Sequence, residues 1–234
     1  MSDTHAAPEA PSLVSNELPG ELQPLPGFGL GPVVDALLKA PAQVLYEIGA
    51  GGQVAAPLIA IIALCAALTG LVMATHAGGT QLLVVPWKIT TGMLFGSVIC
   101  LPSLHILTCL SGGTQTLWET AGTLLMAVAI LGILLVGFAP VGFVFSQATS
   151  SPAFLGAMYL AFLGVSAYFA TRLLRGALER LNGLPMAVVR VWAVVFLMVL
   201  CQLTTTLRPL IGPFEGWDLR ERRFFLEHWS LELD

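Results

Sequence analysis

Charged residues are what this sequence lacks most. Only 10% of its 234 residues are Asp, Glu, Lys or Arg, whereas a soluble domain carries about 25%. Between Ile48 and Thr171 the charged residues are Lys88 and Glu119 alone. With 56% hydrophobic residues and a mean hydropathy of +0.84, the surface of such a chain cannot be kept hydrated. The composition therefore excludes a water-soluble globular protein and indicates that lipid surrounds most of the chain.

Motifs for catalysis and metal binding are missing as well. The sequence has 4 cysteines and 4 histidines, but no C-x-x-C pair occurs and the histidines are scattered. The motifs H-E-x-x-H, G-x-S-x-G and G-x-x-x-x-G-K-[ST] do not occur either. We therefore assign no catalytic residue, metal site, disulfide framework or cofactor. We expect no enzyme activity and no nucleic-acid partner.

Long apolar runs are what the sequence has instead. A helix crosses a bilayer core of about 30 Å with about 20 residues. Five runs reach that length, at about 54–77, 82–110, 116–146, 152–174 and 186–211. The connections "HAGGT" and "SGGTQ" are short, so the spans that they join should be antiparallel neighbours. The predicted fold is an all-α integral membrane bundle of about five transmembrane helices within 49–211.

The N-terminal region divides into two parts. Residues 1–32 are rich in proline and contain no Lys or Arg, which predicts a flexible, mildly acidic tail without a secretory signal. Residues 33–48 have the pattern of an amphipathic helix, with Pro41 able to open a second short helix. Its two faces are Asp35, Lys39, Gln43 and Glu47 against Val34, Leu37, Leu38, Leu45 and Ile48. We interpret this helix as lying on the membrane surface; the alternative is packing against the protein's own loops.

The C-terminal segment, residues 212–234, combines aromatic and charged side chains. Gly212 and Pro213 should stop the last span, and a short amphipathic helix is predicted after them. Exposed aromatic rings at this density need to be covered. The candidate partner-facing residues are therefore Trp217, Phe224, Phe225 and Trp229. Docking of this segment onto the bundle itself is the alternative.

Positive charge is distributed unevenly between the two sides of a five-span bundle. The N-terminal side would hold Lys39, Arg172, Arg175, Arg180 and Arg190; the other side would hold Arg208, Arg220, Arg222 and Arg223. By the positive-inside rule this balance favours a cytoplasmic N-terminus. We expect the protein in a bacterial cytoplasmic membrane.

Glu119 is the carboxylate within the apolar region, and two interpretations fit it. The "TLWE" stretch puts Thr116 and Glu119 in capping-box spacing at the start of a span. Alternatively, Glu119 belongs to an intramembrane polar cluster with His105, Arg172 and Arg190, which the antiparallel layout places near the same membrane face. We favour the capping role.

Two cations and two glycines have simpler interpretations. Lys88, after Pro86 and Trp87, and Arg208 occupy span ends and are candidate interface anchors. Gly92 and Gly96 in "GMLFG" have the small-x-x-x-small spacing that lets helices approach closely, which we interpret as packing within the bundle.

A family resemblance accompanies these features. The stretches "LLKAPAQVLYEI" and "SLHILTCLSGGTQTLWETAGTLLMAVA", together with the five-span layout, resemble the bacterial branch of the Yip family of Ypt/Rab-interacting membrane proteins. The resemblance covers about residues 33–205 and implies a non-enzymatic membrane organiser. No functional residue can be carried over from it.

Two functions follow from the sequence. The first is an organising or accessory subunit that binds partner proteins, or further copies of itself, through its termini and spans. The alternative is a small transporter or channel that uses His105, Glu119, Lys88 and Arg208. Membrane lipid is a partner in both cases.

Overall fold

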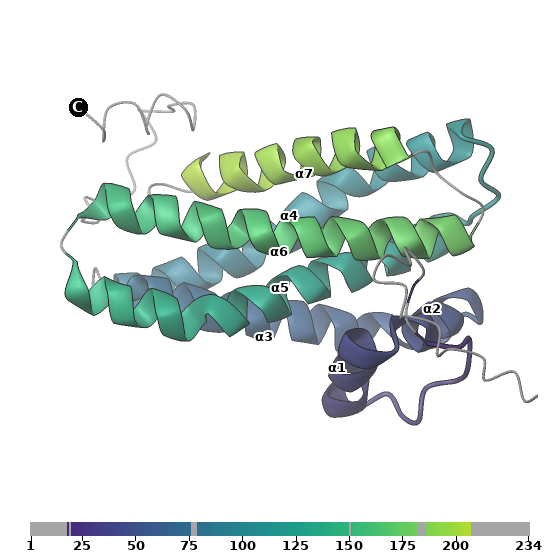
Figure 1. Cartoon of the computed structure of the whole chain (residues 1–234), viewed down its shortest axis with the longest axis horizontal. Helices are drawn as coiled ribbons and strands as arrows, with labels where there is room; N and C mark the ends of the chain where they lie inside the picture. The colour runs from purple at the N-terminus through teal and green to yellow at the C-terminus, as the bar shows by residue number, and fades with distance from the viewer. Residues whose placement is uncertain (1–17, 19, 76–78, 150, 182–185, 207–234) are drawn as a thin grey trace, which may run out of the picture.

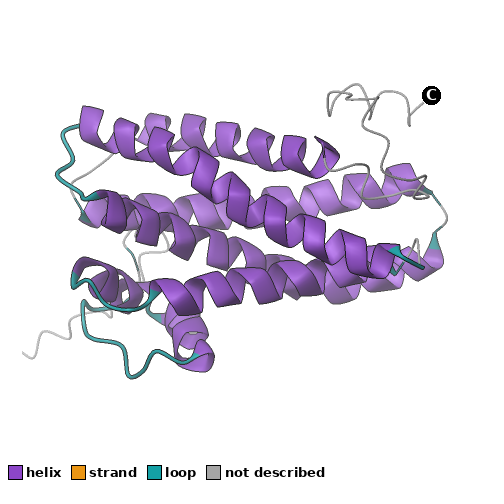
Figure 2. Cartoon of the chain, turned by 180° about the vertical axis from the view of Figure 1, so that it is seen from behind, coloured by secondary structure: helices purple, strands orange, loops and turns teal. Residues whose placement is uncertain are grey.

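A computed structural model describes residues 18, 20–75, 79–149, 151–181 and 186–206, and every regular element in these ranges is an α-helix (Figure 1, Figure 2). The helices are α1 (Leu30–Lys39), α2 (Pro41–Gly49), α3 (Ala55–Ala74), α4 (Gln81–Leu110), α5 (Leu117–Ala148), α6 (Pro152–Arg180) and α7 (Met186–Thr206). The all-α fold class is therefore confirmed.

Four helices, α3 to α6, are long and apolar enough to cross a membrane. Helix α7 has a shorter apolar section, Val188–Leu203, so a fifth span remains a prediction. The predicted boundaries of α3 and α5 are close to the observed ones. Helix α6 extends six residues beyond the predicted end at 174, because the sequence criterion stopped where Arg175 and Glu179 interrupt the apolar run.

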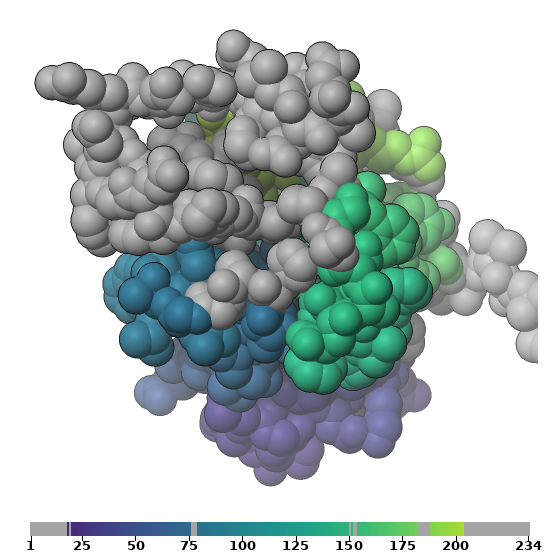
Figure 3. Space-filling view, turned by 90° about the vertical axis from the view of Figure 1, so that its left-hand side faces the viewer, coloured from purple at the N-terminus to yellow at the C-terminus, as the bar shows by residue number. Residues whose placement is uncertain are grey.

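The helices α3 to α7 run antiparallel to their neighbours in sequence (Figure 1), and their contacts close a ring in the order α3, α4, α7, α6, α5, with a further contact between α4 and α5. Helix α3 packs on α4 and α5, α6 packs on α5, and α7 closes the ring against α4 and α6. We call the end covered by α1 and α2 the proximal end; α3, α5 and α7 begin there, and α4 and α6 end there. At the opposite, distal end, the adjoining ends of α3 and α4 in blue and of α5 and α6 in green lie side by side (Figure 3).

Glycines set the closest helix contacts in this ring. A Cβ added to Gly70 of α3 would lie 2.6 Å from the Cα of Pro86 in α4, so the two backbones are in direct contact there. A Cβ on Gly96 of α4 would lie 2.7 Å from Leu200 Cδ2 in α7, whereas one on Gly92 would meet nothing within 4 Å. The predicted packing of small residues within the bundle is confirmed for Gly96.

The N-terminal segment, residue 18 and residues 20–50, which we call the collar, packs on one side of the bundle against α3 and α5 (Figure 1). Pro41 opens α2, as expected, and Ala40 separates it from α1 with an extended φ of −144°. The apolar inner face of the collar is fully buried and includes Val33, Leu37, Val44 and Ile48. The segment thus packs on helices α3 and α5 of the bundle, whereas the alternative interpretation expected packing against the protein's own loops. Its place at the membrane surface stays a prediction.

Three details of the N-terminal predictions need correction. Helix α1 begins at Leu30, within the predicted tail. Leu18 and Leu25, also in that tail, are buried against the bundle; most of the rest of the tail, residues 1–17 and 19, lies outside the described residues. Finally, the helical wheel assigned two residues to the wrong face. Glu47, placed on the polar face, is buried, and Leu38, placed on the apolar face, is 55% exposed. A wheel assumes one straight helix, whereas Ala40 breaks this one into two.

Candidate functional site

Glu119 starts helix α5 in the manner predicted. The backbone N–H of Thr116 donates to Glu119 Oε2 at 2.7 Å, and the Glu119 N–H donates to Thr116 Oγ1 at 3.2 Å. The Thr116 hydroxyl also donates to the same carboxylate at 2.9 Å. These reciprocal bonds are a complete capping box. The capping role of Glu119 is therefore confirmed.

His105 lies close by, but its hydrogen bonds lead elsewhere. The Thr120 hydroxyl donates its single hydrogen to the Thr116 carbonyl at 3.1 Å. His105 Nδ1 lies 3.1 Å from Thr120 Oγ1, and its Nε2 lies 3.7 Å from Cys109 Sγ; the tautomer of the ring decides which nitrogen donates. This chain of bonds ends on a main-chain carbonyl. Among the described residues, no hydrogen bond joins His105 to the Glu119 carboxylate.

Arg172 and Arg190, the other members of the predicted polar cluster, do not join Glu119. Both side chains are exposed, and neither makes a hydrogen bond or ion pair with any described residue. Within residues 18–206, apart from the ranges left undescribed, the structure thus brings together His105 and the Thr116–Glu119 cap. It leaves the two arginines outside.

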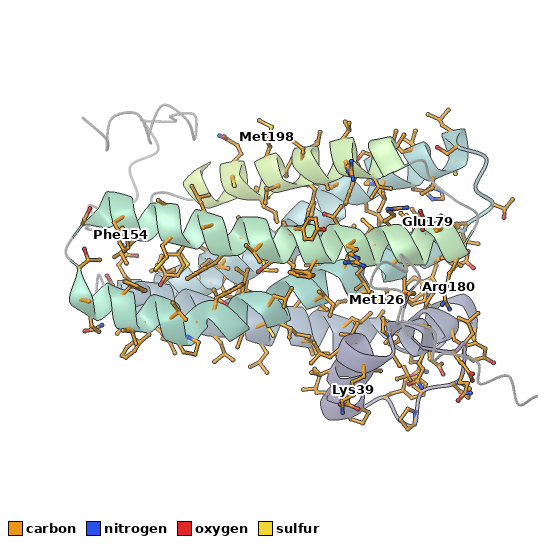
Figure 4. All side chains as sticks on the ribbon, viewed as in Figure 1. Lys39, Met126, Phe154, Glu179, Arg180 and Met198 are labelled. Atoms are coloured by element: carbon orange, nitrogen blue, oxygen red, sulfur yellow. The ribbon has the colours of Figure 1, made fainter. Side chains whose placement is uncertain are left out.

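Other charged side chains at the proximal end form an ion pair within α6 and a hydrogen bond to the collar. Arg175 Nε and Glu179 Oε1 form an ion pair at 2.7 Å along α6. Arg180 Nη2 donates to the Leu18 carbonyl at 2.7 Å, which ties the collar to the end of α6. In Figure 4, Glu179 and Arg180 lie at the end of the molecule opposite Phe154, and Lys39 lies on α1 below the bundle.

Lys88 differs from the expected interface anchor. Its side chain is only 8% exposed, whereas the neighbouring Trp87 is 72% exposed. Lys88 therefore faces the protein, and Trp87 occupies the outward position at the distal end. Arg208 and the C-terminal candidates Trp217, Phe224, Phe225 and Trp229 lie outside the described residues.

Sequence reasoning missed two polar groups that hold the proximal end together. Glu47 Oε1 accepts from the Leu25 N–H at 3.1 Å, and its carboxylate lies in the space left by the missing side chain of Gly52. Gln115 Nε2 donates to the Leu181 carbonyl at 3.0 Å, which links the α4–α5 turn to the end of α6. The "GAGG" that follows Glu47 by two residues was the available signal, because glycines leave room for a side chain to fold back.

Within the described ranges, no group of three or more His, Cys, Asp or Glu side chains is placed to hold a metal ion. The cysteines Cys65, Cys100, Cys109 and Cys201 are free thiols. No protein family, no curated protein and no solved structure shows significant similarity to the chain. The Yip resemblance accordingly remains a prediction.

Two substitutions test the structural role of Glu119. Glu119→Gln keeps an oxygen that accepts from the Thr116 N–H, so the free energy of unfolding should change little. Glu119→Leu removes that acceptor and should lower the free energy of unfolding by about 1 kcal/mol. Both can be measured by SDS titration of the purified protein in mild detergent. Equal destabilisation of the two variants would show that the carboxylate charge, and not the cap, is what α5 needs.

Proposed function

We propose that the protein is a non-enzymatic organising or accessory subunit of a membrane, which binds partner proteins through its collar, its termini and its spans. The observation that carries this proposal is the way the collar is fixed. Apolar side chains, the Glu47–Leu25 bond and the Arg180–Leu18 bond hold it on the bundle. A non-spanning segment anchored so firmly is a rigid platform.

The outer surface of this platform is apolar in several places. Leu22, Phe28, Leu30 and Leu38 are exposed on the collar, outside the ring of long helices. Exposed large apolar side chains can serve as contact surfaces for other proteins. The C-terminal segment 212–234 is the second proposed contact element, on the strength of its aromatic residues.

The proposed setting is a bacterial cytoplasmic membrane with the N-terminus on the cytoplasmic side. Lys and Arg divide equally between the two sides once Lys88 is counted, five on each, so the support for this orientation is the family resemblance. The resemblance to Yip proteins favours the same organising role and the same orientation. A homo-oligomer is an acceptable form of this proposal, since a second copy is also a partner.

Partner capture by collar variants tests the proposal. Replacing Leu30 and Leu38 by serine should reduce the amount of each co-purified partner by on the order of tenfold, because apolar anchors carry most interface energy. The matched control is Asp35→Ser with Lys39→Ser, which removes an exposed ion pair from the same helix. Partners are quantified by mass spectrometry after purification in mild detergent, and a third variant lacks 217–234. If all variants retain the same partners in the same ratio, neither the collar nor the tail is a contact element.

A small transporter or channel is the alternative, and the burial of Lys88 favours it. Ionisable groups inside apolar spans frequently mark ion pathways. In proteoliposomes, a transporter would show ion or solute flux that Lys88→Gln abolishes while the protein remains folded. Flux of that kind from a chain that co-purifies with no partner would replace the organising role by transport.

A further inference from the structure

Arg172 of α6 and Arg190 of α7 are two exposed cations that have no counter-charge among the described residues. Neither makes a hydrogen bond or an ion pair in the described part of the chain. Two described acids of the proximal end are engaged elsewhere: Glu119 in its capping box and Glu179 with Arg175. A guanidinium group at the edge of an apolar span without an anion is costly.

Both side chains point outward from the ring. Trp192 is buried and donates to Ser103 Oγ of α4 at 3.0 Å, so this side of α7 faces α4. Arg190, two residues earlier, lies about 200° away around the helix. Leu174 is likewise buried on α6, and Arg172 precedes it by two residues. Each arginine is therefore on the face opposite the bundle.

The neighbours of the two arginines on these outer faces are apolar. Tyr168 is 64% and Phe169 47% exposed before Arg172, and Val191 is 66% and Val194 59% exposed after Arg190. Side chains of this kind on the outside of a membrane bundle face lipid. The medium around both guanidinium groups is therefore lipid on one side and the headgroup region on the other.

Both arginines also lie near the proximal end of their helices. Arg172 is eight residues, about 12 Å, before the end of α6, and Arg190 is four residues, about 6 Å, after the start of α7. Helix α6 has 29 residues, about 44 Å, which exceeds a hydrocarbon core of about 30 Å. Its charge-free stretch from 154 to 171 accounts for most of that core. Arg172 and Arg190 are then at headgroup level, on helices that pack together.

We propose that Arg172 and Arg190 form a binding site for the headgroup of an anionic phospholipid on the proximal side of α6 and α7. The planar fork of a guanidinium group matches two phosphate oxygens, and such charge-assisted bonds are the strong ones. Anionic lipid thereby neutralises the two cations that are unpaired in the described part of the chain. This site is independent of the proposed organising role.

Displacement of a fluorescent phosphatidylglycerol tests the site on the full chain in zwitterionic detergent. Unlabelled phosphatidylglycerol should displace the probe far better than phosphatidylcholine. Arg172→Gln with Arg190→Gln should weaken binding of the probe by about fivefold for each arginine removed. Lys39→Gln is the matched control, because it removes a cation already paired with Asp35 at 2.6 Å, and it should bind the probe normally.

Two further arms make the outcome decisive. The double variant Arg172→Lys with Arg190→Lys keeps both positive charges, so it should bind the probe better than the double glutamine variant. It also shows whether the fold tolerates substitution at these two positions. Inorganic phosphate should displace the probe no better than chloride at the same ionic strength. Unchanged binding in the glutamine pair, or displacement by inorganic phosphate as effective as by unlabelled lipid, would overturn the lipid site.

Discussion

Gly70→Ala should lower the free energy of unfolding by about 3 kcal/mol, the upper end of the usual cost of overpacking. The added Cβ would lie 2.6 Å from the Cα and 2.9 Å from the N of Pro86. Both are backbone atoms, so no side-chain rotation can relieve the contact. Helices α3 and α4 must move apart, and they share one of the largest contacts in the ring. SDS titration of the purified protein in mild detergent measures the effect.

Gly92→Ala is the matched control for this prediction. Gly92 is also a buried helical glycine, in α4, but a Cβ there would meet nothing within 4 Å. Alanine favours the helix by up to about 1 kcal/mol over glycine, so this variant should be as stable as the unaltered protein or slightly more stable. Equal destabilisation at the two positions would mean that α3 and α4 do not meet at Gly70.

Gly122→Ala should detach the collar at a cost of about 2 kcal/mol. A Cβ on Gly122 of α5 would lie 2.6 Å from Cγ2 and 2.9 Å from Cγ1 of Ile48 in α2. Ile48 is only 2% exposed, so its branched side chain has no free space to enter. We expect faster amide hydrogen exchange in residues 30–49 and little change in the middle of α3 and α4.

Ile48→Ala separates a steric effect at this contact from a general loss of stability. Alone, it leaves a cavity and should destabilise the protein by about 2–5 kcal/mol. Combined with Gly122→Ala, it makes room for the new methyl group, so the double variant should be more stable than the sum of the two losses predicts. Strict additivity would contradict direct packing of Ile48 on Gly122. Gly137→Ala, also on α5 but with nothing within 4 Å, should leave the collar in place.

The proposed binding of partner proteins depends on the same packing of the collar on α5. If the collar is the platform for other proteins, Gly122→Ala should weaken partner binding although it alters no exposed side chain. The double variant with Ile48→Ala should recover part of it. The two collar experiments thus connect a packing contact to the proposed function.

The sequence alone determined the class of the fold and the capping of one helix. Composition and run length are enough for the first, because a chain so poor in charge has to place about 20-residue apolar helices in lipid. The capping role of Glu119 could be predicted because the two residues of the capping box, Thr116 and Glu119, lie within four residues of each other along the chain. Local signals of this kind do not depend on how the helices pack.

The tertiary structure decided which polar side chains face the protein. Lys88 follows the exposed Trp87 by one residue, and nothing local indicates that the lysine is the one that turns inward. Glu47 is buried because Leu25, 22 residues earlier, brings it an N–H. The His105 side chain contacts Thr120 and not the carboxylate of Glu119, although Glu119 and Thr120 are adjacent in sequence. The direction of a side chain in a helix bundle depends on how each helix is rotated, and that rotation is fixed by contacts between distant segments such as Gly70 with Pro86 and Gly122 with Ile48.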